Sequence, residues 1–337
     1  MNSAVQSVRP ALSVVIPCFN EARGLAELHA RLAKVLHPGF GDIEIIFVND
    51  GSTDDTRDVI ESLAQSDDRI GRIDLSRNFG KEAALSAGMD HARGDAVIFM
   101  DADLQDPPEC IPAMVGAWRD GYDVVAMKRV ARTADSLLRR SLASFFYSTL
   151  SSLSDVQIPV DVGDFRLLSR RALDAVKALP ERNRYTKGLF AWVGFRTIEL
   201  DYARPGRHTG TSKWPLLKLI KLAVDGITSF SIAPLRLASI TGLAIALFSL
   251  AYGSFILLRT LLLGDSVAGF PSLFIMIAFL GGAQLMAIGL LGEYVGRLLV
   301  ESKQRPIYLV DEARLPIIHT NLISRSSDAV RRHSAKA

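Results

Sequence analysis

Two aspartates one residue apart, Asp101 and Asp103, directly follow an apolar run at residues 97–100. A short apolar run bounded by turn residues is typical of a buried strand, and Pro107 with Pro108 ends the extended stretch and favours a new helix. Ligands of open α/β sheets bind at the carboxyl ends of the strands, where these carboxylates would lie. Mg²⁺ and Mn²⁺ prefer oxygen ligands and share their remaining positions with substrate phosphates. The pair therefore predicts a site for a divalent metal and a phosphate-bearing substrate.

Polar side chains also follow two earlier apolar runs, at residues 12–16 and 43–48. These side chains are Asn20, Glu21, Asp50 and Ser52. Apolar strand-like runs alternate with helical patterns over residues 12–100, which predicts an α/β fold with a mainly parallel, Rossmann-like sheet and right-handed crossovers. Because parallel strands end at one edge of the sheet, we expect the four side chains to lie beside Asp101 and Asp103.

Two long uncharged runs in the C-terminal half predict a membrane domain. They cover about residues 237–258 and 270–292, and about 20 apolar residues suffice to cross a bilayer. A buried hairpin in a soluble core is the alternative. The segment before them, 214–232, is apolar except for charges on one helical face, which is typical of a helix lying in the membrane interface.

The predicted organisation has five parts. They are a flexible N-terminus (1–10), a catalytic domain (11–213), an interfacial amphipathic helix (214–232), a membrane domain of two transmembrane helices (233–296) and a tail (297–337). Lys and Arg flank the two apolar runs more often than they lie between them, so the positive-inside rule places the catalytic domain and both termini in the cytoplasm. The formal net charge of +3 gives no general signal for nucleic acid, and the two cysteines fit a reducing compartment.

Three further segments receive weaker predictions. Residues 193–202 have the composition of a strand, and residues 305–310 are expected to add an edge strand either to this domain or to a neighbouring molecule. The helix predicted over residues 135–153 either packs in the core or lies on the membrane surface, because it combines a large apolar share with Arg139 and Arg140.

A basic, glycine-containing loop precedes the interfacial segment. Its residues Arg207, Ser212 and Lys213 suit the binding of a phosphate group near the membrane, and a charge cluster that only sets the membrane orientation is the alternative. A nucleotide-sugar donor would explain the metal site, and a lipid phosphate acceptor would explain the membrane segments. The second pKa of a phosphate monoester is about 6, so such an acceptor can attack with little help from a general base.

Four motifs in order resemble those of family 2 glycosyltransferases with the GT-A fold. They are Val14-Val-Ile-Pro17-Cys-Phe-Asn20-Glu21, Val48-Asn-Asp50-Gly51-Ser52-Thr-Asp54, Arg77-Asn78-Phe79-Gly80-Lys81 and Asp101-Ala-Asp103-Leu-Gln105-Asp-Pro-Pro-Glu109. Together with Asp161-Val-Gly-Asp164-Phe-Arg166-Leu and the two apolar runs, the chain resembles bacterial polyisoprenyl-phosphate glycosyltransferases related to dolichol-phosphate-mannose synthase. The resemblance covers roughly residues 11–310.

The resemblance implies an inverting transfer from a UDP- or GDP-sugar to a polyprenyl phosphate, with Mg²⁺ or Mn²⁺ as cofactor, at the bacterial inner membrane. By position, the nucleotide-sugar would be bound by Pro17, Asn20, Glu21, Asp50, Ser52, Lys81 and Asp101. The metal would be held by Asp103 and Gln105, and the catalytic carboxylates would be Asp101, Asp103 and Asp164. Asp164 either acts on the acceptor or orients an arginine. Arg166 joins Arg207, Ser212 and Lys213 as a candidate for the acceptor phosphate. Some members of the family are tetramers, which implies a homo-oligomer.

UDP-glucose is the favoured donor because glucose is frequent in the family, and undecaprenyl phosphate is the acceptor expected in a bacterium. The product would serve cell-envelope glycans such as lipopolysaccharide. Transfer of 4-deoxy-4-formamido-L-arabinose for lipid A is the second prediction. A processive polysaccharide synthase would carry Q-x-x-R-W before its membrane helices, and residues 183–187 do not match that motif. A non-catalytic membrane assembly protein that retains the fold is the alternative from another class, and the paired carboxylates argue against it.

Overall fold

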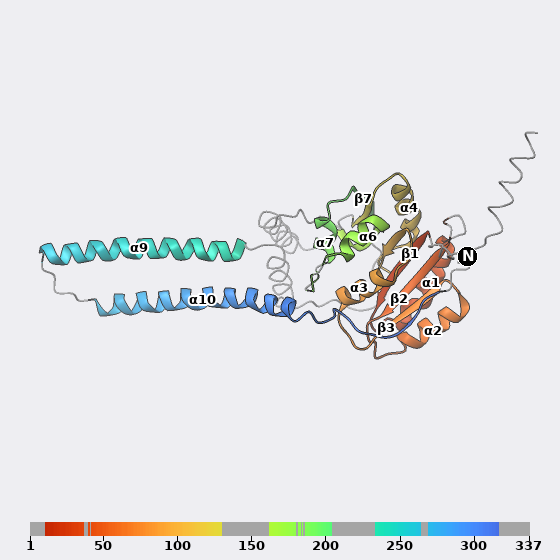
Figure 1. Ribbon diagram of the computed structural model, residues 1–337, viewed down its shortest axis with the longest axis horizontal. Coiled ribbons are helices and arrows are strands. Elements are labelled where there is room, and N and C mark those ends of the chain that lie inside the picture. Colours follow the sequence, from red (N-terminus) through yellow and green to blue (C-terminus); the bar gives the residue numbers. More distant parts are fainter. Residues whose placement is uncertain are drawn as a thin grey trace, which may run out of the picture.

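The computed structural model describes residues 11–36, 40, 42–129, 162–179, 181–182, 184, 186–203, 233–263 and 269–316. These residues form an α/β domain from which two long helices project (Figure 1). The domain is built on an eight-stranded sheet in the order β7-β5-β6-β4-β1-β2-β3-β8. The α/β fold and the two apolar C-terminal helices that the sequence predicts are confirmed.

Four parallel strands make up the centre of the sheet: β1 (Leu12–Cys18), β2 (Ile43–Asn49), β3 (Ile70–Leu75) and β4 (Ala96–Phe99). β1 lies between β2 and β4 and is parallel to both, with Val14 opposite Ile45 on one side and Ile98 on the other. Every residue of β2, β3 and β4 is buried. Burial on both faces is characteristic of parallel strands covered by helices on each side, and it places all four carboxyl ends at one edge.

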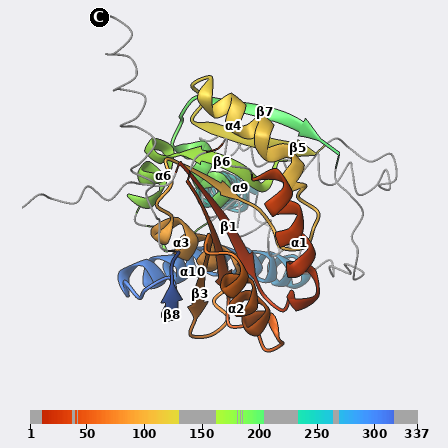
Figure 2. The same cartoon turned by 90° about the vertical axis from the view of Figure 1, so that its right-hand side faces the viewer.

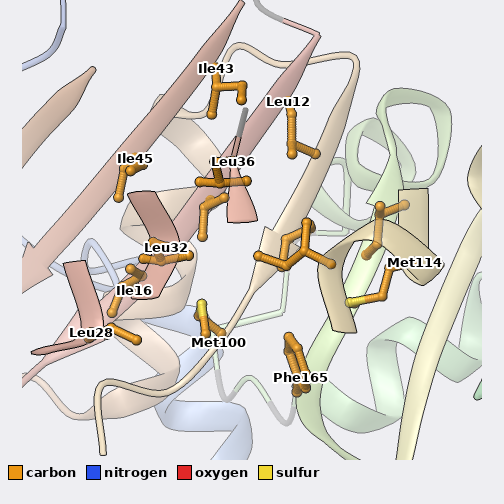
Figure 3. Packing of buried hydrophobic residues seen from close by; sticks show 14 of the residues in the cluster. Leu12, Ile16, Leu28, Leu32, Leu36, Ile43, Ile45, Met100, Met114 and Phe165 are labelled. Atoms are coloured by element: carbon orange, nitrogen blue, oxygen red, sulfur yellow. The ribbon is translucent and has the colours of Figure 1, made fainter. Parts of the chain in front are cut away.

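Helices cover both faces of the sheet, and α1 and α3 lie on opposite sides of β1 (Figure 2). One face carries α1 (Ala22–Val35), α2 (Thr56–Ser66), the short η2 (Pro108–Cys110) and α4 (Ile111–Arg119). Leu28 and Leu32 of α1 pack there with Ile16 and Ile45 of the sheet (Figure 3). The other face carries α3 (Lys81–His91), α6 (Arg170–Lys177) and α7 (Thr186–Trp192).

The second half of the sheet is mixed and contains β5 (Val124–Arg129), β6 (Val162–Ser169) and β7 (Thr197–Tyr202). β6 lies between β4 and β5 and is antiparallel to both, with Arg166 opposite Phe99. Since antiparallel partners move in opposite directions, the same register places Asp164 opposite Asp101, just beyond the end of β4. The strand expected over 193–202 begins only at Thr197, because α7 continues to Trp192 and Gly194 turns the chain with a φ of 67°.

α9 (Ala233–Leu263) and α10 (Phe270–Ser302) run antiparallel and side by side (Figure 1). Windows at Ala238–Phe255 and Phe279–Ser302 are long and apolar enough to cross a membrane by length and composition. Large apolar side chains point away from protein, with Leu250 70% exposed and Met286 77% exposed. An exposed apolar surface of this kind is typical of a contact with a membrane or with another protein. Both helices extend past the predicted spans, because their helical pattern continues into more polar residues at the ends.

The chain returns to the sheet after α10. β8 (Val310–Arg314) pairs antiparallel with β3 at the edge, with Arg314 opposite Arg72. The edge strand expected at 305–310 therefore begins at Val310. Pro306 has no N–H group that could donate to a neighbouring strand. Just before β8, the carbonyl of Leu309 accepts a hydrogen bond from the backbone N–H of Ser76 at 2.9 Å. The N-terminal segment 1–10, the helix predicted over 135–153, the interfacial helix 214–232 and residues 317–337 of the tail lie outside the described residues.

Candidate active site

The carboxyl ends of β1, β2 and β4 surround a cleft of about 270 Å³. Six of the predicted site residues line it: Pro17, Glu21, Asp50, Lys81, Asp101 and Asp103. Four of these carry a carboxylate group and one carries an ammonium group. The lining formed by these residues is therefore acidic, and an anionic nucleotide would bind there together with a cation.

Asn20 and Ser52 lie beside the cleft and tie two of its loops together. The backbone N–H of Asn20 donates a hydrogen bond to Oγ of Ser52 at 3.0 Å, and Oδ1 of Asn20 accepts one from the N–H of Thr53 at 2.9 Å. Asn20 has a φ of 57°, a left-handed conformation that asparagine tolerates better than most residues. The two side chains thus fix the loop after β1 against the loop after β2, and their contact with a nucleotide stays a prediction.

Asp50 anchors the loop that precedes α3. Its carboxylate accepts hydrogen bonds from the N–H groups of Phe79 at 2.7 Å and Gly80 at 2.9 Å. Burial raises the pKa of Asp50, and these two N–H groups oppose the rise. Gly51 allows this close approach, because a Cβ there would lie 2.4 Å from the backbone carbonyl carbon of Arg77. The loop after β2 therefore positions Lys81, the first residue of α3.

Lys81 joins the two carboxylates that β4 and β6 bring together. Its Nζ atom lies 2.5 Å from Oδ1 of Asp101 and 2.6 Å from Oδ2 of Asp164. Burial alone would lower the pKa of Lys81, but the two negative charges outweigh it and the pKa lies above its usual range. Burial would likewise raise the pKa of Asp164, whereas Lys81 and the nearby Lys187 hold it below its usual range. Asp164 is therefore ionised at neutral pH.

The turn that contains Asp101 and Asp103 is held by a buried acid. Oδ2 of Asp106 accepts a hydrogen bond from the N–H of Asp101 at 3.0 Å, and Oδ1 of Asp103 accepts one from the N–H of Gln105 at 3.1 Å. Leu104, which lies between Asp103 and Gln105, has a φ of 61°, and such a value is uncommon for a residue other than glycine. Burial and the charge of Asp101 raise the pKa of Asp106 to about 6. The side chains of Asp101 and Asp103 are thus aimed at the cleft by a strained turn.

The donor set fits a hard divalent cation that a substrate completes. Among the described residues, no group of three or more His, Cys, Asp or Glu side chains could hold a metal alone. Mg²⁺ is typically bound through one or two carboxylates with substrate phosphates and water in its other positions, and Asp103 beside Asp101 supplies that number. Gln105 is only 5% exposed and is not among the residues that line the cleft. Its predicted role as a metal ligand stays a prediction and would require its amide to turn outward.

The acceptor-phosphate candidates are placed less completely. Arg166 is 4% exposed, donates a hydrogen bond from Nη2 to the carbonyl of Gly163 at 2.6 Å, and stacks over the ring of Phe190 at 4.4 Å. Its guanidinium group therefore holds β6 against α7, and its predicted contact with the acceptor stays a prediction that this burial does not favour. Arg207, Ser212 and Lys213 lie outside the described residues.

The structure also brings residues to the site that the motifs did not indicate. Glu82 accepts hydrogen bonds from the backbone N–H of Thr186 at 3.1 Å and from its hydroxyl group. Burial and the nearby charge of Asp164 raise the pKa of Glu82 to about 7. Burial lowers the pKa of Lys187, which follows Thr186 in α7. The only sequence signal for Glu82 is its place next to Lys81, and none marks Lys187.

A mixed α/β sheet with paired carboxylates at its strand ends is an arrangement that can hold a divalent metal against a phosphate-bearing substrate. The family model described as "Glycosyl transferase family 2" matches residues 13–177. An uncharacterized glycosyltransferase of Synechocystis sp. is 48% identical over 301 residues, which cover 89% of this chain and 95% of that protein. This chain therefore belongs to glycosyl transferase family 2, which confirms the resemblance read from its motifs.

Another relative carries a more specific name. The bactoprenol glucosyl transferase of Shigella phage SfV is 46% identical over 299 residues, which cover 89% of this chain and 97% of that protein. Among solved structures, glucosyl-3-phosphoglycerate synthase from Mycobacterium tuberculosis, crystallised with Mn²⁺, UDP and phosphoglyceric acid, has a TM-score of 0.46 and 21% identity. That alignment covers 65% of this chain and 76% of the synthase.

Proposed function

We propose that this enzyme transfers a glucosyl group from UDP-glucose to a polyprenyl phosphate, with inversion at the anomeric carbon. The observation that carries the proposal is the ion pair of Lys81 with Asp101 and Asp164, beside Asp103, in a chain with two long exposed apolar helices. A nucleotide donor accounts for the acidic cleft, and a lipid acceptor accounts for the helices. The relative named bactoprenol glucosyl transferase supports the choice of glucose and of an isoprenoid acceptor.

In the proposed reaction, a phosphate oxygen of the acceptor forms a bond to C1 of glucose on the face opposite UDP. The bond between C1 and the β-phosphate oxygen breaks, and its electron pair leaves with UDP. The acceptor phosphate is largely dianionic near neutral pH because its second pKa is about 6, so no proton has to be removed. Lys81 lowers the pKa of Asp164. Asp164 is then available as a carboxylate that orients cationic groups and need not act as a base.

The residues of the donor side have separate tasks in this proposal. Asp103, with Asp101 beside it, would hold Mg²⁺ or Mn²⁺ against the diphosphate of the donor. When bound, the metal neutralises the charge that develops on the departing UDP. Pro17, Glu21 and Asp50 line the part of the cleft that would accept the nucleotide.

The membrane arrangement is part of the same proposal. We place α9 and α10 across the bacterial cytoplasmic membrane, with the catalytic domain (11–213) and both termini in the cytoplasm, because Lys and Arg flank the apolar runs. A reporter that is active only in the periplasm, fused after Ala337, should then give no signal. A strong signal would reverse the orientation. A homo-oligomer remains a prediction.

A transfer assay tests the reaction directly. Purified enzyme in detergent would be incubated with Mg²⁺, undecaprenyl phosphate and a panel of radiolabelled UDP- and GDP-sugars, one at a time. We expect label from UDP-glucose in the organic phase, and none without metal or without the lipid. Label from another sugar alone would replace glucose as the substrate, and binding of UDP-glucose without any transfer would contradict the enzymatic role.

A further inference from the structure

Two dipeptides from different helices meet at the catalytic centre. Lys81 and Glu82 begin α3, and Thr186 and Lys187 begin α7. Glu82 accepts hydrogen bonds from both the N–H and the hydroxyl group of Thr186, which is fully buried. Glu82 follows Lys81, which is ion-paired with Asp164. The hydrogen bonds between Glu82 and Thr186 therefore hold Lys187, the residue after Thr186, close to the catalytic centre.

Lys187 lies on the face of α7 that packs against the sheet. Residues three apart in a helix share a face, so Lys187 and Phe190 point to the same side. The ring of Phe190 packs 5.9 Å from that of Phe99, at the end of β4, and lies under the guanidinium group of Arg166 in β6. This face therefore looks toward the ends of β4 and β6, where Asp164 lies.

Several cationic side chains lie around Gly163 and Asp164. Arg166 donates to the carbonyl of Gly163, and a Cβ on Gly163 would lie 2.9 Å from Nη2 of Arg129, so both guanidinium groups touch this segment. Lys81 divides its charge between Asp164 and Asp101. Burial and then the neighbouring cations lower the pKa of Lys187, although Asp164 opposes this. A phosphate group bound beside these cations would form charge-assisted hydrogen bonds.

We propose that Lys187 binds the phosphate group of the lipid acceptor and that Glu82 positions it by fixing α7. The inference rests on the proposed function and names a residue of its acceptor site. A phosphate monoester suits the position because it brings close to two negative charges at neutral pH. The diphosphate of the donor is the other phosphate source. Lys187 and Asp164 are absent from the residues that line the nucleotide cleft, which favours the acceptor.

Steady-state kinetics with the full-length enzyme separate the two phosphate sources. Lys187→Met keeps most of the apolar stem and removes the charge. We expect it to raise the KM for undecaprenyl phosphate about 10-fold or more, the usual effect of losing a charge-assisted hydrogen bond, with the KM for UDP-glucose changed less than about twofold. Lys187→Arg should recover most of the loss. Lys177→Met, which removes a lysine of α6 that pairs with Asp90, is the matched control and should match the wild type.

Different outcomes overturn different parts of the proposal. Equal changes in the two KM values, or a weaker inhibition by UDP in Lys187→Met, would assign Lys187 to the donor diphosphate. Glu82→Ala should reproduce the rise in acceptor KM, whereas Glu82→Gln, which keeps an oxygen for Thr186, should recover most of that loss. An unchanged acceptor KM in Glu82→Ala would remove the positioning role.

A binding measurement keeps the inference testable if the proposed transfer itself fails. Wild-type enzyme should bind a short polyprenyl phosphate more tightly than the matching polyprenyl alcohol, and Lys187→Met should lose at least about 10-fold of that preference. An unchanged preference in a variant with the wild-type melting temperature would overturn the inference. Absence of glucosyl transfer by the wild type, with the preference intact, would overturn the proposed reaction alone.

Discussion

In the proposed assignment the catalytic centre has a donor side and an acceptor side, and the two are built differently. On the donor side, the loops after β1 and β2 and the turn after β4 are held by hydrogen bonds to backbone N–H groups, as in Asp50 with Phe79 and Gly80. On the acceptor side, side chains that lie far apart in the sequence hold each other, as in Lys81 with Asp164 and Glu82 with Thr186. Backbone hydrogen bonds fix geometry within a loop, whereas the acceptor side depends on charges from β6, α3 and α7.

This difference predicts which substitutions act locally and which spread. A substitution of Asp103 by asparagine can stay local, because the amide keeps the oxygen that accepts a hydrogen bond from the N–H of Gln105. An acceptor-side residue leaves a buried charge or polar group unsatisfied, which is a larger disturbance. Substitutions on each side, taken in order of expected effect, test the contrast.

Asp103→Asn should have the largest effect and should stay confined to the donor side. The amide keeps the shape of the side chain but removes the charge that would hold the metal, so we expect kcat to fall on the order of 10³-fold with an unchanged melting temperature. Transfer assays over a range of Mg²⁺ concentrations measure this. Asp120→Asn, at an exposed position after α4, is the control. Retained activity with full metal dependence would exclude Asp103 as a metal ligand.

Lys81→Met should damage both halves, because Lys81 is the one described ammonium group in contact with carboxylates of β4 and β6 together. Without it, Asp101 and Asp164 repel each other at close range. We expect kcat/KM to fall about 10²-fold, in the range found for removal of preorganised charge, together with a lower melting temperature. If the variant loses activity but keeps the melting temperature of the wild type, the repulsion between Asp101 and Asp164 does not lower the stability of the folded protein.

The Gly51→Ala substitution tests the backbone geometry of the donor side. The new Cβ would lie 2.4 Å from a backbone atom of Arg77 at a φ of 61°, so we expect a loss of at least about 2 kcal/mol in the free energy of unfolding. Gly116→Ala is the matched control, because nothing lies within 4 Å of its added Cβ and the position is helical. It should stabilise the protein by about 0.5–1 kcal/mol. Equal effects at the two glycines, measured by urea unfolding, would contradict the close approach.

The sequence predicts the donor side well because its signals are local. Apolar runs followed by Asn20, Asp50 and Asp101 indicate strands and their exit loops, and the parallel order of the strands then requires these loops to meet. The same reasoning recovers the two apolar C-terminal helices, since the length of an uncharged run needs no knowledge of packing. Errors occur at element ends, as at β7 and β8, where α7 and Pro306 interrupt an otherwise strand-like composition.

The acceptor side could not be predicted because its contacts join distant segments. Nothing near Glu82 in the sequence indicates that its carboxylate will meet Thr186, which lies more than a hundred residues further on. The local sequence pattern also does not predict that β6 lies between β4 and β5, yet this position places Asp164 opposite Asp101. For Arg166 the motif predicts a ligand contact, whereas the structure adds a contact that the motif does not indicate, the packing of its guanidinium group on Phe190.

The pH dependence of stability gives the most specific test of the acceptor side. Burial raises the pKa of Glu82 from 4.5 to about 7, so between these values the folded protein keeps a proton that the unfolded chain has lost. The stabilisation from this group is complete below about pH 4.5 and disappears as the pH rises through 7. In urea unfolding, wild-type protein should therefore lose up to roughly 3 kcal/mol relative to Glu82→Gln between pH 4.5 and 8. Thr186→Val removes a hydroxyl donor that favours the ionised form of Glu82. The loss of stability with pH should therefore occur at higher pH in this variant. Parallel stability curves for wild type and Glu82→Gln would mean that Glu82 is already ionised in the folded protein, and the acceptor side would then hold one more negative charge facing Lys187.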